Sequence, residues 1–195
     1  MKVAVIKYNA GNIRSVSFAL ERMGINFAVT DSEEEIRSAD KVIFPGVGEA
    51  STTMRYLREM KLDKVIKELK QPTLGICLGM QLMCAHSEEN STPCLGIFDE
   101  TVKRFAIDSL KVPHMGWNTI EKVTDWLASA GEDTYFYFVH SYYVPLSSYT
   151  TAQTQYGLPF SASIRKNNFY AVQFHPEKSA GAGEYIIRTF LEQPH

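Results

Sequence analysis

The sequence has little cysteine, no marked excess of charge and no long apolar run, and each of these absences excludes a class of protein. Its 195 residues include three cysteines, Cys77, Cys84 and Cys94, which form neither a C-x-x-C motif nor an even disulfide set. The formal net charge of -2 gives no reason to expect nucleic acid or an anionic membrane as a partner. No apolar run approaches the ~20 residues of a membrane span. We therefore expect a globular protein of the reducing cytoplasm.

What is present indicates one ordinary folded domain. The chain is 45% hydrophobic and 22% charged, as is usual for a globular protein with a packed core. No internal repeat, low-complexity segment or linker interrupts it. We therefore expect residues 1–195 to form a single domain.

The first half of the chain alternates short apolar runs with segments of helical periodicity. Continuous apolar runs are typical of parallel strands that are covered on both faces, and their alternation with helices indicates a doubly wound α/β sheet. The expected strands are 3–6, 27–30, 41–44 and 73–76, and the expected helices start near 13, 33, 54 and 78. The second half contains strand-like segments that suggest an antiparallel extension, at 95–98, 102–105, 135–139, 150–155 and 161–165. A last core strand, 169–174, precedes a closing helix, 184–192.

A cysteine lies at the turn between the strand 73–76 and the helix that follows it. Gly75 and Gly79 flank Cys77 in a G-x-C-x-G pattern, the cysteine form of a nucleophile elbow. The glycines leave room around the nucleophile, and the following helix directs its N-terminus at the sulfur, which favours the thiolate. The amide of Leu78 is placed to help hold an oxyanion. Alone, the pattern more often marks a buried structural thiol than a catalytic one.

A second motif, Pro45-Gly46-Val47-Gly48, follows the strand 41–44. Its two glycines free the backbone to expose amides at the carboxyl end of a strand, the edge of an α/β sheet where ligands bind. The same residues also fit a plain strand-to-helix turn.

A third motif, His175-Pro176-Glu177, ends the last core strand. A cysteine nucleophile needs a base, and the base needs an orienting group. Because Pro176 keeps the preceding residue extended, we expect both side chains on one side. Glu177 would then accept from one imidazole nitrogen while the other faces Cys77. His86, which we place late in the elbow helix, lacks such a partner. An isolated H-P-E segment would fit an exposed turn.

The three motifs, in this order, resemble those of the class I, triad-type glutamine amidotransferases. That family has a P-G-x-G loop, a G-x-C-x-G-x-Q elbow and a C-terminal H-P-E, and the resemblance covers essentially the whole chain. It implies a flavodoxin-like, mostly parallel sheet with an antiparallel extension. It also implies that Cys77, His175 and Glu177 form a triad that hydrolyses glutamine to glutamate and ammonia, with no metal or organic cofactor.

Further segments resemble the glutaminase subunits of imidazole glycerol phosphate synthases. They are 8–16, 79–83, 87–89, 113–118 and 138–142, and Pro113-His114-Met115-Gly116-Trp117-Asn118 is the most specific. Without the resemblance, this last segment would fit a surface loop with its tryptophan packed beneath. The resemblance implies a heterodimer with a (β/α)8-barrel cyclase, which makes imidazole glycerol phosphate and AICAR in histidine biosynthesis. Lys7 departs from the family, which commonly has an aspartate there.

The resemblance also assigns roles around the triad. It implies oxyanion binding by the amides of Val47 and Leu78, and a partner interface that includes Trp117 and Lys178. It implies that glutamine is held by Gly48, Gln81, Glu89, Ser141 and Tyr142. Of the adjacent Glu88 and Glu89, we favour Glu89 for the ammonium group. The alternatives are the glutaminase of anthranilate or pyridoxal phosphate synthesis, another cysteine hydrolase, and a non-catalytic scaffold.

Overall fold

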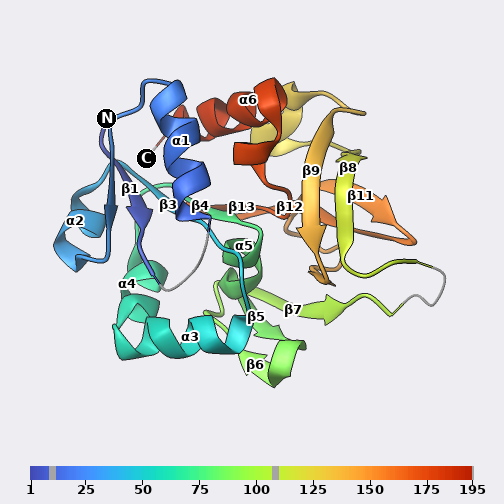
Figure 1. Ribbon diagram of the computed structural model, residues 1–195, viewed down its shortest axis with the longest axis horizontal. Helices are drawn as coiled ribbons and strands as arrows, with labels where there is room; N and C mark the ends of the chain where they lie inside the picture. The colour runs from blue at the N-terminus through green and yellow to red at the C-terminus, as the bar shows by residue number, and fades with distance from the viewer. Residues whose placement is uncertain (9–11, 107–109, 195) are drawn as a thin grey trace.

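A computed structural model describes residues 1–8, 12–106 and 110–194, and within these ranges the chain is built on a seven-stranded sheet (Figure 1). Its strands are β1 (Val3–Ile6), β2 (Phe27–Thr30), β3 (Lys41–Phe44), β4 (Thr73–Ile76), β11 (Thr150–Tyr156), β12 (Leu158–Lys166) and β13 (Phe169–Val172). Their order is β11-β12-β13-β4-β3-β1-β2. From β2 to β13 the strands are parallel, whereas β12 pairs antiparallel with β13 and β11 pairs antiparallel with β12. This confirms the predicted flavodoxin-like sheet and its antiparallel extension.

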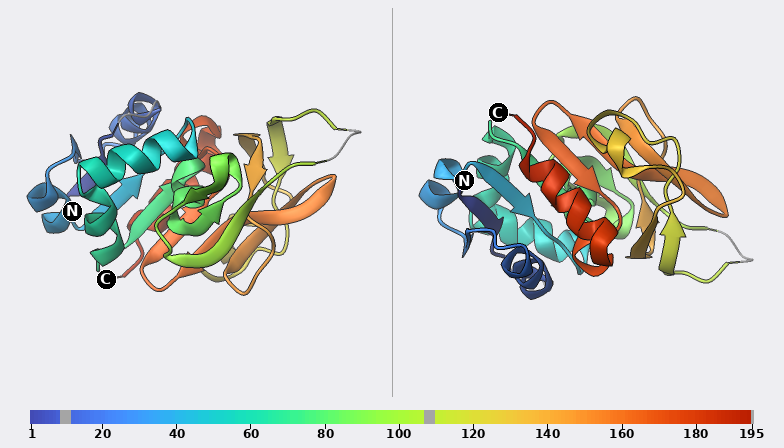
Figure 2. Two further views of the ribbon diagram at one scale, coloured as in Figure 1. Left: turned by 90° about the horizontal axis from the view of Figure 1, so that it is seen from below. Right: turned by 90° about the horizontal axis from the view of Figure 1, so that it is seen from above.

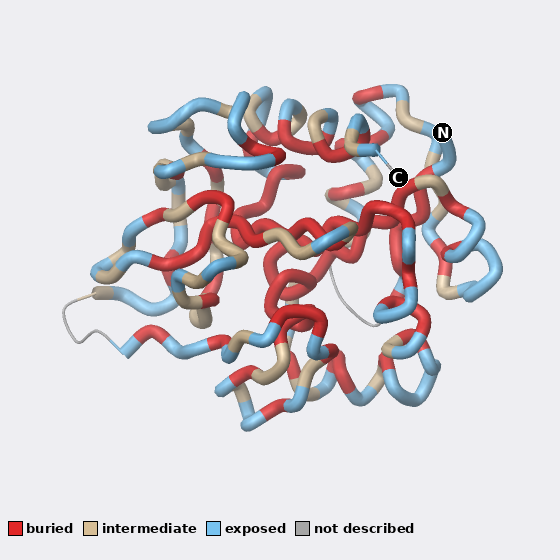
Figure 3. The backbone as a smooth tube through the Cα atoms, turned by 180° about the vertical axis from the view of Figure 1, so that it is seen from behind, coloured by how far each residue is buried: buried red, intermediate tan, exposed pale blue. Residues whose placement is uncertain are grey.

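Side chains that alternate along the strands form a core on each face of the sheet. Val3 and Val5 pack with α1 (Ile13–Arg22) and α6 (Ala180–Leu191), whereas Ala4 and Ile6 pack with the helices of the other face. Those helices are α2 (Glu33–Ser38), α3 (Ala50–Glu59), α4 (Leu62–Glu68) and α5 (Leu78–Met83). The two helical layers appear in turn from above and from below in Figure 2. The central strands β1, β3, β4 and β13 are buried along their whole length, whereas the edge strands β2 and β11 are partly exposed (Figure 3).

Several helix boundaries differ from those expected. The region 54–69 forms two helices, because Lys61 has a φ of +58° and interrupts the helical backbone. α6 begins at Ala180, before the expected start at residue 184.

The short acidic helix α2 is capped by Ser32, whose hydroxyl accepts a hydrogen bond from the Glu35 amide at 3.4 Å.

The elbow helix is shorter than predicted. α5 ends at Met83, and the chain continues as β5 (Cys84–Ser87), so the expected helical position of His86 is wrong. The cause is non-local: the amides of 95–97 donate to the carbonyls of 82–84, which can no longer extend the helix. β5 joins β6 (Thr92–Pro93), β7 (Phe98–Arg104) and β10 (Tyr142–Tyr143) in a small sheet. The expected strands 95–98 and 102–105 therefore reduce to the single strand β7.

The segment most specific to the resemblance forms β8 (His114–Thr119), a strand that the sequence did not predict. It pairs antiparallel with β9 (Tyr135–His140), beside α6 in Figure 1. Trp117 is 53% exposed, so the alternative of a tryptophan packed beneath a loop is wrong. In the described residues, the short 3-10 helices η1 (Glu89–Ser91), η2 (Asp125–Ala130) and η3 (Pro176–Lys178) lie in the connections. Among the helices described, none has the length and apolar character to cross a membrane.

Candidate active site

The three sequence motifs follow three strands that are neighbours in the sheet. β3, β4 and β13 run parallel, with Phe44 opposite Gly75 and Ile76 opposite Val172. Because their carboxyl ends meet at one edge, the loops that leave these strands are brought together there. Residues 45–48, Cys77 and His175 are the parts of the chain that emerge at this edge.

Cys77 has a backbone conformation that is strained for a residue with a side chain. Its φ is +52° and its ψ is -107°, and it is held there by an amide hydrogen bond of 2.8 Å to the Val172 carbonyl. The glycines allow close packing: a Cβ on Gly79 would lie 2.1 Å from the Phe44 carbonyl oxygen, and one on Gly75 would lie 2.9 Å from the Met83 sulfur. The G-x-C-x-G pattern thus sets the elbow directly against the sheet, in addition to clearing space around the sulfur.

His175 and Glu177 form the contact that the sequence predicts. The Nδ1 atom of His175 lies 2.7 Å from Oε1 of Glu177. Both side chains are buried, so the alternative of an exposed H-P-E turn is wrong. The backbone is not extended beyond His175, because residues Pro176–Lys178 form a 3-10 turn, η3, that brings the carboxylate back to the ring. With Nδ1–H donating to the carboxylate, Nε2 is the nitrogen left for the sulfur.

Burial acts to lower the pKa of His175, but its neighbours outweigh burial and raise the pKa to about 10. Cys77 supplies the largest raising influence, chiefly through the charge of its thiolate, and Glu177 supplies the next. The Nε2 atom is buried and makes no hydrogen bond of regular geometry within the described part of the chain. The arrangement therefore favours an imidazolium at His175, beside the sulfur of the predicted nucleophile.

Asn12 also contacts the acid and base, and sequence reasoning assigned it no role. Its Nδ2 donates to Oε1 of Glu177 and lies 3.3 Å from Nδ1 of His175. Asn12 precedes α1 with a φ of +76°. The only signal was the resemblance of the segment 8–16. The sequence also predicts a turn over residues 8–12, of which residues 9–11 lie outside the described residues.

The loop 45–48 is anchored by Tyr8 and rests on the elbow. The Tyr8 hydroxyl donates to the Pro45 carbonyl, and burial together with the charge of Cys77 raises the pKa of Tyr8. The Gly46 carbonyl accepts from the Leu78 amide at 3.3 Å. The Leu78 amide, a predicted oxyanion donor, is therefore engaged by the loop in this conformation.

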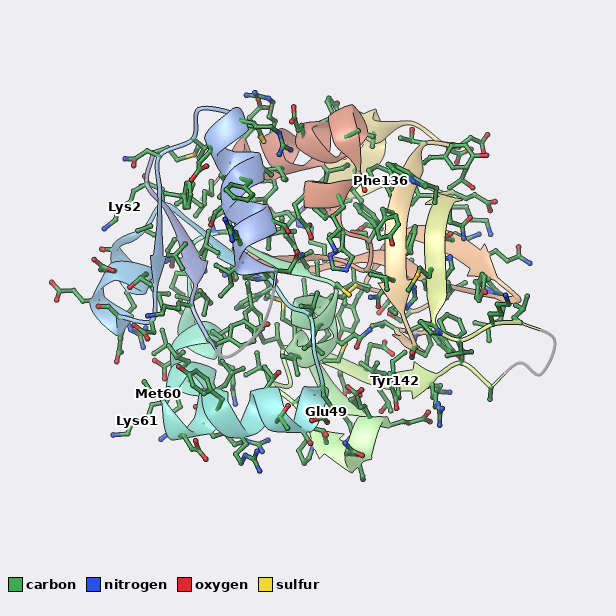
Figure 4. All side chains as sticks on the ribbon, in the orientation of Figure 1. Lys2, Glu49, Met60, Lys61, Phe136 and Tyr142 are labelled. Carbon is green, nitrogen blue, oxygen red and sulfur yellow. The ribbon has the colours of Figure 1, made fainter. Side chains whose placement is uncertain are left out.

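A cavity of about 320 Å³ opens beside the Cys77 sulfur. Every predicted oxyanion and substrate residue lines it: Val47, Gly48, Leu78, Gln81, Glu89, Ser141 and Tyr142. Pro113, Val139 and His140 complete the described lining. Figure 4 shows Tyr142 beside β7 and Glu49 at the start of α3, on the same side of the sheet. The volume falls in the range of small-molecule sites, which are about 300–1,000 Å³.

The two candidate glutamates are placed differently. Glu89 lines the cavity, where its Oε2 accepts from the Ala50 amide at 2.7 Å. Burial raises the pKa of Glu89. Glu88 is absent from the cavity lining that the structure describes, and its carboxylate accepts from the Arg104 amide at 2.8 Å.

The predicted interface residues lie on one exposed patch, joined by Tyr137. The Trp117 and Tyr137 ring centroids are 6.1 Å apart, and the Lys178 Nζ lies 5.9 Å from the Tyr137 ring centroid. Tyr137 was not identified from the sequence. Lys7, the departure from the family, forms an exposed ion pair of 3.9 Å with Asp31.

Comparisons with known proteins agree with this geometry. The family model described as "Glutamine amidotransferase class-I" matches residues 4–193. Proteins named "Imidazole glycerol phosphate synthase subunit HisH" are 62% identical in Bacteroides fragilis and 58% identical in Bacteroides thetaiotaomicron, each match covering 98% of this chain and 100% of the relative. The relative of that name in Idiomarina loihiensis is 45% identical, with 98% of each chain covered.

Solved structures with much lower identity share the fold. A crystal structure of a glutamine amidotransferase superposes with a TM-score of 0.74 at 19% identity, covering 96% of this chain and 98% of its own. The structure of PurLQS from Thermotoga maritima gives a TM-score of 0.72 at 14% identity, covering 97% of each chain. The motifs, the sheet and the family match lead to one assignment: the chain belongs to the class I glutamine amidotransferase family.

Proposed function

We propose that this chain is the glutaminase subunit of an imidazole glycerol phosphate synthase. It would hydrolyse glutamine to glutamate and ammonia, and pass the ammonia to a (β/α)8-barrel cyclase that makes imidazole glycerol phosphate and AICAR in histidine biosynthesis. The observation that carries the proposal is the nucleophile, base and acid set beside a cavity lined by the residues expected to hold glutamine. The names of the full-length relatives support the choice of synthase.

The reaction follows from the protonation of the triad. The Cys77 thiolate attacks the side-chain amide carbon of glutamine, and the His175 imidazolium gives its proton to the departing ammonia. A glutamyl thioester remains on Cys77. Neutral His175 then takes a proton from water, which attacks the thioester, releases glutamate and restores the thiolate and imidazolium. Glu177, whose carboxylate accepts a hydrogen bond from the Asn12 amide, keeps the imidazole in the tautomer that these steps require.

The oxyanion would be held by the amides of Val47 and Leu78. Each donor of this kind contributes roughly 3 kcal/mol in well-studied enzymes, equivalent to about a hundredfold in rate. Because the Gly46 carbonyl engages the Leu78 amide, the loop 45–48 must rearrange before that amide can serve. We propose that the partner and its nucleotide ligand drive this rearrangement, which would keep the isolated subunit slow.

The cavity supplies the charges that an α-amino acid needs. Glu89 would bind the ammonium group of glutamine, because its carboxylate is the one that faces the cavity. Gly48, Gln81, Ser141 and Tyr142 would position the rest of the substrate.

The partner would dock on the patch of Trp117, Tyr137 and Lys178. Ammonia released into water would be diluted and mostly protonated, so a sealed junction between the subunits serves the transfer. We further propose that residues 1–195 act as one domain and that the protein works in the cytoplasm, where its three free thiols would stay reduced.

The proposal is tested by co-purifying the chain with a barrel cyclase and assaying ammonia transfer with glutamine as the nitrogen source. Glutamate release is measured for the isolated chain, for the complex, and for the complex with the cyclase's nucleotide ligand. We expect the rate of glutamate release to rise markedly from the isolated chain to the complex, and again when the nucleotide ligand is added. Equal rates would remove the loop mechanism, and failure to bind or supply the cyclase would remove the choice of synthase.

If the chain fails to bind or supply the cyclase, the next candidates are the glutaminases of anthranilate or pyridoxal phosphate synthesis. The segment 113–118 and the full-length relatives count against them. The presence of Cys77, His175 and Glu177 counts against a scaffold.

A further inference from the structure

A second buried amide side chain contacts the nucleophile. Gln173 follows β13 and is fully buried. Its Nε2 lies 3.5 Å from the Cys77 sulfur, and its Oε1 lies 3.0 Å from Nε2 of Gln81. Neither the motifs nor the triad assign a role to Gln173.

The orientation of both amides is fixed by a backbone carbonyl. Nε2 of Gln81 lies 2.9 Å from the Tyr142 carbonyl oxygen, which can only accept a hydrogen bond. The Gln81 amide must therefore present its nitrogen there, and its second N–H is given to Gln173. Oε1 of Gln173 must accept that bond, so the group that faces the sulfur is an N–H donor.

The Tyr142 carbonyl also accepts a hydrogen bond from His140, the first of two neutral histidines that are hydrogen-bonded in series. Nδ1 of His140 lies 2.6 Å from the Tyr142 oxygen, and Nε2 of His140 lies 3.0 Å from Nδ1 of His114. Asn118 approaches Nε2 of His114 at 3.4 Å. Burial lowers the pKa of His140 to about 3 and that of His114 to about 4, so each ring has one donor and one acceptor. Each hydrogen bond in this series is then donated in the direction of the Tyr142 carbonyl.

We propose that Gln173 is a fixed N–H donor that stabilises and positions the Cys77 thiolate, and that Gln81 and the Tyr142 carbonyl hold it in that orientation. The proposal rests on the glutaminase function above and adds a residue to its machinery. The sulfur also lies 3.8 Å from the Val139 carbonyl oxygen, a contact that suits a thiol and repels a thiolate. The Gln173 donor offsets that repulsion and keeps the charged sulfur near His175.

The test measures the reactivity of Cys77 without glutamine. The full-length chain is treated with iodoacetamide over a range of pH, and alkylation of each cysteine is followed by peptide mass. Cys94 is an internal reference, because burial raises the pKa of its thiol to about 12. The variants are Gln173→Met, which lacks the donor, and Gln173→Asn, which withdraws the amide by one methylene.

The matched control is Gln71→Met. Gln71 is another buried amide, and its Nε2 donates to the Ile36 carbonyl at 2.8 Å, at the opposite end of β4 from Cys77. A hydrogen bond to a charged group commonly changes an equilibrium by roughly tenfold to a hundredfold. We therefore expect half-maximal alkylation of Cys77 to move up by about one pH unit or more in both Gln173 variants. Their kcat for glutaminase in the cyclase complex should fall about tenfold or more.

An unchanged alkylation profile in the Gln173 variants, or an equal shift in Gln71→Met, overturns the proposal. If Gln173→Met is not recovered folded, Gln173→Asn decides alone. Alkylation needs no glutamine, so a chain without glutaminase activity would still show the shift. An active chain without the shift would overturn only the role of Gln173.

Discussion

The substitution Gly183→Ala tests whether packing against α6 holds η3, the turn that positions His175 and Glu177. A Cβ at this position would lie 1.8 Å from the carbonyl oxygen of Pro176. That carbonyl cannot turn away freely, because it accepts from the Ser179 amide at 3.0 Å within η3. The Ser179 hydroxyl also donates to the His175 carbonyl at 2.7 Å. Either α6 or the turn must therefore move.

The displacement is large enough to matter for catalysis. Real Cβ atoms stay beyond about 3.0 Å from such an atom, so the 1.8 Å contact requires a shift on the order of 1 Å. Overpacking of this kind costs about 1–3 kcal/mol, and alanine in a helix returns up to about 1 kcal/mol relative to glycine. We expect a net loss of about 1–2 kcal/mol in the free energy of unfolding. Moving the acid and base by this distance should lower kcat about a hundredfold.

Gly181 provides the matched control in the same helix. A Cβ there meets no atom within 4 Å, so Gly181→Ala should keep full activity and gain up to about 1 kcal/mol of stability. Urea unfolding gives both free energies, and glutamate release in the cyclase complex gives kcat. The reasoning is refuted if Gly183→Ala retains wild-type kcat, or if the two variants lose activity equally.

Three further predictions concern the site. The pKa of His175 is raised from 6.5 to about 10, so its contribution to stability is complete below about pH 6.5 and is lost as the pH rises toward 10. In Cys77→Ala the free energy of unfolding, measured with urea, should decline less between pH 6.5 and 10 than in the wild type. An equal decline would contradict the coupling between Cys77 and His175. Tyr8→Phe leaves the carbonyl at the start of the loop 45–48 unpaired, so the free energy of unfolding should fall by about 1–3 kcal/mol and the stimulation by the cyclase should shrink. Unchanged stability and stimulation would count against that anchor. Glu89→Gln should raise KM for glutamine at least tenfold, whereas Glu88→Gln should not, and steady-state kinetics that reversed this order would reassign the ammonium site.

The parallel core and the meeting of the three motifs could be predicted from the sequence, because both depend on local patterns. Strands β1, β3, β4 and β13 are buried along their whole length and are apolar apart from Lys41 and Thr73, the first residues of β3 and β4. Such runs indicate parallel strands, and the carboxyl ends of adjacent parallel strands form one edge. The residues that follow them had to share that edge once the strands were neighbours.

The features that could not be predicted depend on contacts between distant segments. α5 stops at Met83 because the amides of residues 95–97 donate hydrogen bonds to the carbonyls of residues 82–84, and no local pattern in 82–86 indicates this. Gln173 interrupts an apolar segment without any pattern that reveals a contact with Cys77. Asn12 reaches Glu177 across 165 positions of the chain. Tertiary placement, rather than propensity, decides each of these.

The central claim is that Cys77, activated by His175, attacks the glutamine amide. The most direct test is to quench the cyclase complex with acid during turnover and to search its peptides for a glutamyl adduct, which is glutamine minus ammonia. We expect the adduct on Cys77 alone, its loss in Cys77→Ala together with glutamate release, and its retention in a Cys84→Ala control. An adduct on another residue, or glutamate release that survives in Cys77→Ala, would contradict the account.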